Sequence, residues 1–345
     1  MRGLVVDKNG LLSIVKLPMP KINPYQALVR LKSCGVCNGT DMKLIHRAFK
    51  NFDTYPAVLG HEGVAEVVEV GSRVTSLQIG DMVLLPFLEG MSGEFYSGWG
   101  AYSEYAVVGD AKAYENDGLQ VPSEAYLAQT VLSLTDKVDH VGAAMIITFR
   151  EVLSAVRRFG MQPNKNLVVF GTGPVGLCII RFAKLLGMDK VYAIDIDEEK
   201  VRTAKAMGAD EAFNSLSCDV IKEIKDRLPK GADYVVDAVG VNALINQAMG
   251  LIADHGKICC YGISPKLSME LDWTNAPYNW SLDFVQWPSK AEESQAHNQV
   301  MTWINMDVLN PMDFISHVIP FENILDAFRI LEEKRPGTKK IVIEF

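Results

Sequence analysis

Two cysteines, a histidine and a glutamate stand in the first fifth of the chain in an arrangement that could do chemistry. Cys34 and Cys37 form a C-x-x-C pair in the stretch CGVCNGTDMK, and His61 and Glu62 follow in the stretch GHEGVAEVVEVG. A C-x-x-C pair is typical of a redox couple or of half a zinc knuckle. Thiolate, imidazole and carboxylate together are a mixture that zinc accepts. The residues therefore predict a metal site at Cys37, His61 and Glu62, with a redox pair as the alternative for the cysteines.

A glycine-rich motif follows in the stretch LVVFGTGPVGLCII. Gly171, Gly173 and Gly176 have G-x-G-x-x-G spacing, directly after an apolar strand-like run and at the start of a helix-like one. The first glycine permits a tight turn, the second lets the backbone approach a pyrophosphate, and the third lets the helix pack on the strand. The helix N-terminus supplies NH groups and a positive dipole end. The motif predicts a dinucleotide site, with a purely structural turn as the alternative.

The next predicted strand ends at Asp195, which favours NAD over NADP. A carboxylate at this place can accept hydrogen bonds from the adenosine ribose hydroxyls and would repel a 2'-phosphate. The full set of predicted cofactor contacts is Gly171, Thr172, Gly173, Pro174, Val175, Gly176, Asp195, Lys200, Val239 and Tyr261.

The elements that must position these residues change character along the chain. Up to about residue 110, short β-rich segments are separated by turn residues. Beyond about residue 148, apolar strands alternate with helices, which is typical of a parallel sheet covered on both faces. The final strand, KKIVIEF, needs a partner, and the β-rich block is the obvious host. The prediction is an α/β protein in which a doubly wound domain at 148–288 is inserted into a discontinuous domain at 1–147 and 289–345.

Composition narrows the possible partners and location. The 345 residues include 42 acidic and 34 basic side chains, for a formal charge of -8, and no basic run could follow a phosphate backbone. No apolar run is long enough to span a bilayer, and charges interrupt the N-terminus before a signal-peptide core could form. We therefore expect no nucleic acid or membrane partner and a cytosolic location. Six cysteines are too sparse for a disulfide scaffold.

Several segments resemble the medium-chain, zinc-dependent alcohol and polyol dehydrogenase family. They are GHEGVAEVVEVGSRVTSLQIGDMV, GWGAYSEYAVV, VVFGTGPVGL and ISHVIPFENILDAF, in the family's order over nearly the whole chain. The resemblance implies a GroES-like β-rich catalytic domain, a Rossmann domain, NAD(H), and one catalytic zinc at the cleft between the domains. It also implies that Cys37 is a zinc ligand, that Cys34 has no assigned role, and that the protein forms a homodimer or homotetramer.

The chain departs from the family pattern at three places. The stretch PFLEGMSGEFYSGWGAYSEY lacks the clustered cysteines that hold a structural zinc in many members, so no second zinc is expected. The segment CNGTD is one residue longer than the usual form, which leaves Thr40 as the candidate proton relay and Lys43 as a second. Ile147 stands where relatives have the third zinc ligand. Glu62 is the preferred substitute, and Glu151, one helical turn beyond Ile147, is the weaker one.

The resulting hypothesis is an NAD(H)-dependent dehydrogenase that interconverts a secondary alcohol, a polyol or sugar derivative, with its ketone. Zinc would act as a Lewis acid at Cys37, His61 and Glu62, and Thr40 with Lys43 would pass the proton outward. One alternative is a zinc-free reductase of the same superfamily that acts on quinones or activated alkenes. Another is a non-catalytic NADH-binding protein. Trp99 and the aromatic residues of 279–300 are either a substrate wall or ordinary packing residues.

Overall fold

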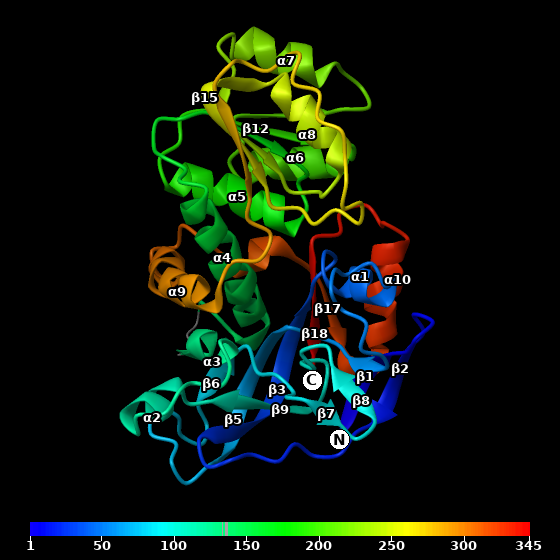
Figure 1. The fold of residues 1–345 in the computed structure, drawn as a ribbon, viewed down its shortest axis with the longest axis vertical. Helices are drawn as coiled ribbons and strands as arrows, with labels where there is room; N and C mark the ends of the chain where they lie inside the picture. Colours follow the sequence, from blue (N-terminus) through cyan, green and yellow to red (C-terminus); the bar gives the residue numbers. More distant parts are fainter. Residues whose placement is uncertain (133, 135–136) are drawn as a thin grey trace. The chain divides into compact units, whose positions relative to one another are not determined.

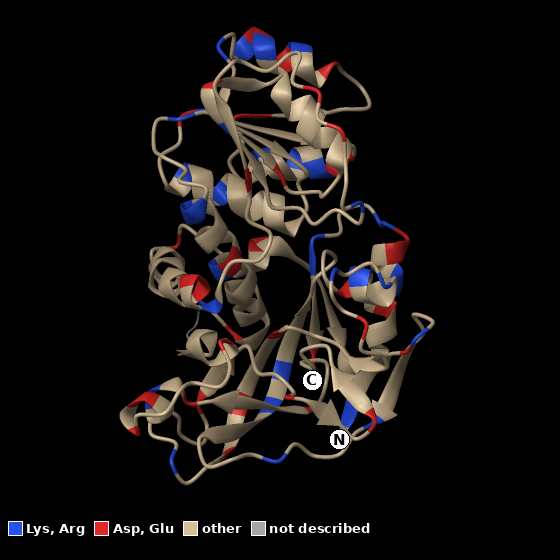
Figure 2. Cartoon of the chain, viewed as in Figure 1, with Lys and Arg blue, Asp and Glu red and all other residues tan. Residues whose placement is uncertain are grey.

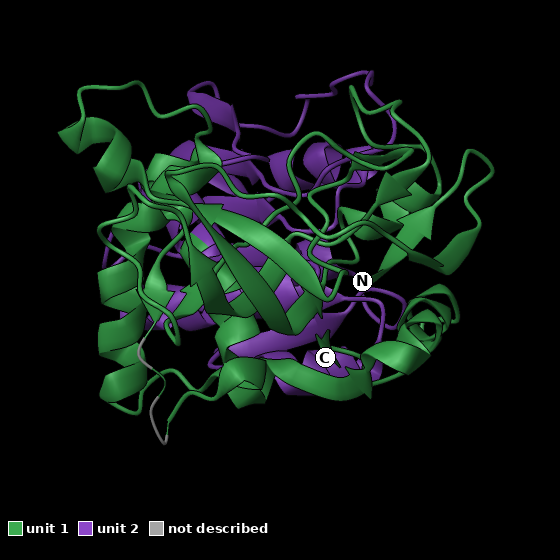
Figure 3. Cartoon of the chain, turned by 90° about the horizontal axis from the view of Figure 1, so that it is seen from below, with its two compact units in different colours: residues 1–150, 289–345 green, residues 151–288 purple. Residues whose placement is uncertain are grey.

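The computed structural model describes residues 1–132, 134 and 137–345, which form two compact units. Unit 1 consists of Met1–Arg150 and Ser289–Phe345, and unit 2 consists of Glu151–Pro288 (Figure 3). The sequence predicted the changes of domain after residues 147 and 288. Within the described part of the chain, no helix has the length and apolar character needed to cross a membrane.

In its described residues, unit 1 is built around two mainly antiparallel sheets, each with one parallel pair of strands (Figure 1). One sheet has the strand order β2-β1-β4-β8-β7, and the other has the order β10-β6-β5-β3-β18-β17, with β9 also paired to β3. The strands are β1 (Arg2–Val6), β2 (Leu12–Lys16), β3 (Gln26–Val36), β4 (Ala57–Val58), β5 (Glu62–Val70), β6 (Met82–Leu84), β7 (Met91–Ser92), β8 (Phe95–Ser97), β9 (Tyr105–Gly109), β10 (Val131–Leu132), β17 (Ile315–Pro320) and β18 (Lys340–Glu344).

The C-terminal strand pairs with the N-terminal block, as the sequence predicts. Strand β18 runs antiparallel to β3, with Val36 opposite Ile341, and parallel to β17. On its other side β3 pairs with β5, with Gly35 opposite Glu62. The long central strand β3 therefore places the beginning of β5 and the beginning of β18 on either side of its own C-terminal end.

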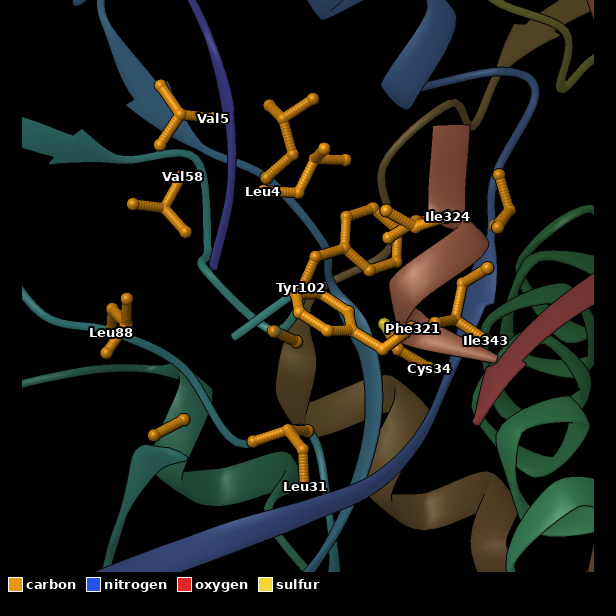
Figure 4. Packing of buried hydrophobic residues seen from close by; sticks show 14 of the residues in the cluster. Leu4, Val5, Leu31, Cys34, Val58, Leu88, Tyr102, Phe321, Ile324 and Ile343 are labelled. Carbon is orange, nitrogen blue, oxygen red and sulfur yellow. The ribbon is translucent and has the colours of Figure 1, made fainter. Parts of the chain in front are cut away.

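A hydrophobic core joins the strands of unit 1 to the C-terminal helix. Leu31, Tyr102 and Phe321 lie in this cluster of buried residues together with Cys34, and Figure 4 shows the Tyr102 ring among them. Cys34 is fully buried, and both it and Cys37 are free thiols. Burial also raises the pKa of the Cys34 thiol well above its usual value. Cys34 therefore serves packing, and the structure does not support an accessible redox pair.

Helices of unit 1 flank the sheets. They are α1 (Asp41–Ile45), α2 (Ala111–Asn116), α3 (Ala125–Ala128), α9 (Lys290–Asn305) and α10 (Ile324–Glu332), with the 3-10 turns η1 (Pro311–Phe314) and η2 (Phe321–Asn323). A capping box starts α9, because the Ser289 side chain accepts from the Glu292 backbone and the Glu292 side chain accepts from the Ser289 backbone. Helix α4 (His140–Arg158) begins in unit 1 and ends in unit 2.

Unit 2 contains the predicted doubly wound parallel sheet. All of residues 151–288 are described, and their six strands have the order β13-β12-β11-β14-β15-β16, every neighbouring pair being parallel. The order reverses between β11 and β14, which is where ligands bind in sheets of this kind. The strands are β11 (Leu167–Phe170), β12 (Val191–Asp195), β13 (Glu211–Asn214), β14 (Ala232–Asp237), β15 (Ile252–Cys260) and β16 (Trp280–Phe284).

Amphipathic helices cover the sheet of unit 2. They are α5 (Pro174–Leu185), α6 (Glu198–Ala206), α7 (Val220–Arg227) and α8 (Asn242–Met249). Every residue of β11, LVVF, is buried, as expected for a strand with both faces covered. Helix α6 begins at the cap Asp197, whose side chain accepts from the backbone NH groups of Glu199 and Lys200. Lys and Arg residues are interspersed with Asp and Glu residues in both units (Figure 2).

Candidate functional site

The three predicted metal ligands converge in unit 1. One ligand atom from each of Cys37, His61 and Glu62 lies within 4.8 Å of the other two. Cys37 directly follows β3, and His61 and Glu62 stand at the start of β5. Since Gly35 and Glu62 are paired across these strands, the strand register brings the cysteine loop beside the histidine. The arrangement therefore follows from the pairing of β3 with β5.

Asp41 organises the cluster from the first residue of α1. It is fully buried, and its Oδ2 accepts hydrogen bonds from the Cys37 NH at 3.0 Å and from the Tyr102 hydroxyl at 2.6 Å. Its Oδ1 lies 3.4 Å from His61 Nδ1, and within the described chain neither of these two buried atoms makes a hydrogen bond of good geometry. The carboxylate thus faces the cysteine loop with one oxygen and the imidazole with the other.

The His61 imidazole responds to two opposing effects. Burial lowers its pKa, but the Asp41 carboxylate and then Cys37 stabilise the protonated ring more strongly, so that the pKa lies well above its usual value. A ring that faces a buried carboxylate is a site where positive charge is favoured. A metal cation bound at the ring would benefit from the same surroundings.

Glu62 has a second set of partners on its far side. Its two oxygens lie 2.8 and 2.6 Å from Lys340 Nζ, and its Oε1 accepts a hydrogen bond from the Thr148 hydroxyl at 3.2 Å. Both members of the Glu62–Lys340 pair are almost fully buried. Ile147, next to Thr148 on α4, is itself buried. The residue at the expected third-ligand position is thus apolar, and the neighbouring hydroxyl holds Glu62 instead.

The two predicted proton-relay residues lie beside the cluster. Thr40 is buried and immediately precedes α1. Lys43, on the first turn of α1, donates from Nζ to the Gly39 carbonyl at 2.8 Å. Burial lowers the pKa of Lys43, and the nearby Cys37 opposes this only in part. Lys43 can therefore give up its proton more readily than an exposed lysine.

An aromatic pair borders the imidazole. The Trp99 ring centroid lies 5.4 Å from that of His61 and 6.0 Å from that of Phe49, which it meets edge to face. Trp99 has a φ of 67°, an uncommon backbone conformation for a large residue. The loop after β8 thus holds an indole against the candidate metal ligand.

Glu151, the weaker substitute ligand, is not part of this cluster. The cluster found among the described residues contains Glu62 and not Glu151. The Glu151 carboxylate accepts a hydrogen bond from the Tyr261 hydroxyl at 2.5 Å, inside unit 2. Of the two carboxylates considered from the sequence, the geometry favours Glu62.

The glycine motif in unit 2 has the backbone geometry that its spacing predicts. Gly171 has a φ of 88°, in the region where glycine is preferred. A Cβ on Gly176 would lie 1.9 Å from the Gly171 carbonyl oxygen, whereas a Cβ on Gly173 would meet nothing within 4 Å. Gly176 is therefore required by packing, and Gly173 leaves open space at the N-terminus of α5, where a pyrophosphate could approach.

The other predicted cofactor residues line up along the carboxyl edge of the same sheet. Gly171 follows β11, Asp195 ends β12, Val239 comes shortly after β14, and Tyr261 directly follows β15. These four strands are consecutive in the sheet order β12-β11-β14-β15. Thr172 lies in the glycine-rich loop before α5, and Pro174 and Val175 are the first two residues of that helix. Lys200 lies in the first half of α6.

Asp195 is held in a fixed orientation. Its Oδ2 accepts from the Thr172 backbone NH at 2.7 Å and from the Thr172 hydroxyl at 2.9 Å, and its Oδ1 accepts from the Ile196 NH at 2.8 Å. Because Thr172 lies inside the glycine motif, the carboxylate is tied directly to that turn.

Four residues of these sites were missed in the sequence. They are Asp41, Tyr102, Thr148 and Lys340. Asp41 closes the segment CNGTD, so its place beside Cys37 was a usable signal. Lys340 offers a weaker signal, as a lysine at the start of an apolar strand. Tyr102 and Thr148 carry none, because only the fold brings them to the site.

Comparison with known proteins decides the family. A model of the zinc-binding dehydrogenases matches residues 174–282, and a model of the alcohol dehydrogenase GroES-like domain matches residues 23–117. An alcohol dehydrogenase from Geobacillus stearothermophilus is 31% identical over an alignment that covers 76% of this chain and 77% of the relative. This chain belongs to the medium-chain, zinc-type alcohol dehydrogenase family. It is an oxidoreductase of the alcohol and polyol dehydrogenase type.

Solved structures show that this dehydrogenase has the fold of the family along its whole length. An alcohol dehydrogenase from Escherichia coli CFT073 complexed with NADH is 22% identical, with a TM-score of 0.81 over 100% of this chain and 99% of that one. The 2R,3R-butanediol dehydrogenase from Bacillus subtilis is 20% identical, with a TM-score of 0.80 and the same coverage. The predicted combination of a GroES-like domain with a Rossmann sheet is confirmed.

Proposed function

We propose that this dehydrogenase binds one zinc ion at Cys37, His61 and Glu62 and uses NAD(H) to interconvert a secondary alcohol with its ketone. The convergence of a thiol, an imidazole and a carboxylate, with ligand atoms within 4.8 Å of one another, is the observation that carries the proposal. Three protein ligands leave one position of a tetrahedral zinc ion for the substrate.

The charges around the cluster fit a divalent cation. Metal ligation requires the thiolate form of cysteine, so Cys37, Asp41 and Glu62 would together contribute three negative charges. Lys340 contributes one positive charge. The remaining two negative charges match a divalent ion, and buried charge without such compensation is costly.

The donor atoms can be assigned from the contacts of each residue. Asp41 faces His61 Nδ1, which leaves Nε2 for the metal, as in other carboxylate–histidine–zinc arrangements. Cys37 would donate its sulfur, and Glu62 an oxygen lone pair that Lys340 does not use. When bound, zinc would supply Lewis-acid chemistry and lower the pKa of the substrate hydroxyl.

The chain's own residues would remove the proton of that hydroxyl. We assign this step to Thr40 as a hydroxyl relay and to Lys43 as the group that passes the proton towards solvent. The lowered pKa of Lys43 supports the second role, because a fraction of amine is needed to accept a proton. The hydride, with its electron pair, would pass from the carbon that bears this hydroxyl to the nicotinamide, and the alcohol would become a ketone.

NAD is the cofactor that unit 2 supports best. Asp195 is fixed by Thr172 at the end of β12, where a carboxylate suits ribose hydroxyls and disfavours a 2'-phosphate. The similar structure from Escherichia coli CFT073 is a complex with NADH, which supports a nicotinamide cofactor in this fold. Gly173 would give its pyrophosphate room at the start of α5.

A small polyol or sugar derivative is the substrate class we propose. The butanediol dehydrogenase among the similar structures acts on a diol, and the Trp99 ring beside His61 offers a face on which a carbon chain bearing hydroxyls could pack. We further propose that the enzyme acts as a cytosolic homodimer or homotetramer, without nucleic acid or membrane partners.

A zinc-free reductase is the second candidate. Ile147 at the position of the third ligand favours it, and so does Lys340, which already neutralises Glu62. Such an enzyme would reduce quinones or activated alkenes and would not need the Cys37 thiolate.

The test is a substrate panel with a ligand variant. Secondary alcohols, polyols and sugar alcohols are offered with NAD or NADP, and the reduced cofactor is followed by absorbance. We expect turnover with NAD, and a loss of at least about 100-fold in Cys37→Ser, because the Lewis acid would be lost. Turnover that Cys37→Ser leaves intact, or turnover only on quinones or activated alkenes, would favour the zinc-free reductase.

A further inference from the structure

A buried ammonium group contacts one of the candidate metal ligands. Lys340 Nζ lies 2.8 and 2.6 Å from the two oxygens of Glu62, and their side chains are 3% and 2% exposed. A lysine and a glutamate are rarely buried to this extent unless they are paired. In this buried contact the ammonium and the carboxylate compensate each other's charge.

Three adjacent strands build this pair. Glu62 begins β5, Lys340 begins β18, and β3 runs between them with Gly35 opposite Glu62. A Cβ on Gly35 would lie only 2.2 Å from Glu62 Oε2. The glycine thus leaves the space in which the carboxylate lies over β3 and meets the lysine, while Thr148 holds Oε1 with its hydroxyl.

We propose that Lys340 is a positioning residue that sets the metal affinity of the site through Glu62; this inference rests on the proposed metal site. Without metal, the ammonium is the cation that makes a buried Glu62 tolerable. A metal ion on the same carboxylate brings a second cation close to the first. Lys340 therefore stabilises the metal-free protein and weakens metal binding by electrostatic repulsion.

The same contact has a geometric effect. Lys340 and Thr148 restrain both oxygens of Glu62, so the carboxylate is held in one orientation beside Cys37 and His61. A ligand that is shared with a lysine donates less charge to a metal than a free one. The site is then preformed, remains folded without metal, and holds its ion less tightly than three unshared ligands would.

A double-mutant cycle tests the coupling directly. Wild type, Lys340→Met, Glu62→Gln and the double variant are titrated with zinc in competition with a chromophoric chelator, and the thermal midpoint of each metal-free protein is recorded. Met is unbranched and only one atom shorter than lysine, and it carries no charge. Lys340→Arg is the matched control, because it retains the charge.

We expect Lys340→Met to bind zinc about tenfold more tightly than wild type, within the range of couplings between linked sites. The same change made in the Glu62→Gln background should leave the affinity unaltered, because the shared carboxylate is gone. Metal-free Lys340→Met should melt at a lower temperature than wild type, and added zinc should restore more of its stability. Lys340→Arg should resemble wild type in both measurements.

Two results would overturn the proposal while leaving the metal site in place. One is zinc affinity in Lys340→Met equal to or weaker than that of a zinc-binding wild type. The other is an equal increase in zinc affinity when Lys340→Met is made with Glu62 present and with Glu62→Gln. Removal of the lysine charge would then act on the metal directly and not through the carboxylate. Wild type that takes up no zinc would instead contradict the proposed function and this inference together. If metal-free Lys340→Met does not fold, recovery of native circular dichroism on adding zinc supports the coupling, and failure to recover contradicts it.

Discussion

The glycine turn of unit 2 and the charged cluster of unit 1 are built by opposite means. At the turn, the decisive features are backbone conformation and missing side chains, as the Gly171 φ of 88° and the closeness of Gly176 to the Gly171 carbonyl show. At the cluster, the decisive features are side chains brought together from β3, α1, β5, α4 and β18. The first site is local in sequence and the second is not.

This difference bears on how each site tolerates substitution. A backbone site tolerates few substitutions, because any Cβ at Gly176 collides with backbone. A side-chain site can replace one donor by another at a different place, and in the proposed site Glu62 would serve in place of a donor at position 147. The comparison predicts that a substitution at a packed glycine of the turn strongly lowers stability. At the cluster, a second substitution can offset the effect of the first on metal affinity.

The sharpest contrast is expected between two glycines of the same turn. Gly176→Ala places a Cβ 1.9 Å from a backbone oxygen, so we expect a loss of more than about 3 kcal/mol of unfolding free energy. Gly173→Ala meets no atom within 4 Å, so stability should hold while NADH affinity falls. Thermal unfolding and NADH fluorescence titration measure the two effects. Equal destabilisation by both variants would contradict the division of roles.

A carboxylate placed at position 147 tests whether the proposed metal site can accept a further ligand there. Ile147→Glu adds a carboxylate on α4 next to Thr148, and in a zinc-binding protein it should raise zinc affinity by about 10- to 100-fold, as an additional anionic ligand does. The metal-free variant should be less stable, because Ile147 is buried. Ile147→Gln serves as the control, since it adds a polar group without charge. Unchanged zinc affinity in Ile147→Glu would show that position 147 does not face the metal.

Acid should lower the stability of unit 1 through His297, which is far in sequence from Cys37, His61 and Glu62. Burial and the positively charged Arg150 lower the pKa of His297 to about 4. Between about pH 6.5 and 4 the unfolded chain therefore binds a proton that the folded chain does not, so stability falls as the pH is lowered through this window. We expect His297→Gln to remove about 1–2 kcal/mol of that loss, allowing for solvent screening. Denaturant unfolding at pH 7 and pH 5 measures it, and an equal loss in both proteins would exclude His297 as the cause.

The smallest effect is expected at the cofactor carboxylate. Asp195→Ser removes the charge that disfavours a 2'-phosphate, so the preference for NAD over NADP should fall by about tenfold. Thr172→Val keeps the charge but removes the hydroxyl that contacts Asp195, and it should change the preference less. The ratio of kcat/KM values for the two cofactors reports both. An unchanged ratio in Asp195→Ser would mean that another residue selects the cofactor.

The sequence predicted most of the turn but only part of the cluster. The spacing of the glycines and the apolar runs were enough to place Gly171 to Gly176 at a turn and Asp195 at the end of the next strand. These residues lie within one β-α-β unit, β11-α5-β12. The pairing of Glu62 with Lys340 joins residues 278 positions apart, so no local pattern contains it. The predicted boundary at residue 147 falls inside α4, which runs unbroken from His140 to Arg158. A continuous helix gives no change of composition at the point where one compact unit ends.

Zinc content per chain, by elemental analysis of protein dialysed against a weak chelator, is the most direct test of the proposed metal site. Wild type should retain about one equivalent, and Cys37→Ser should retain far less while NADH binding stays intact, because the cofactor turn lies in unit 2. Zinc absent from wild type, or retained fully by Cys37→Ser, would contradict a metal site at Cys37, His61 and Glu62.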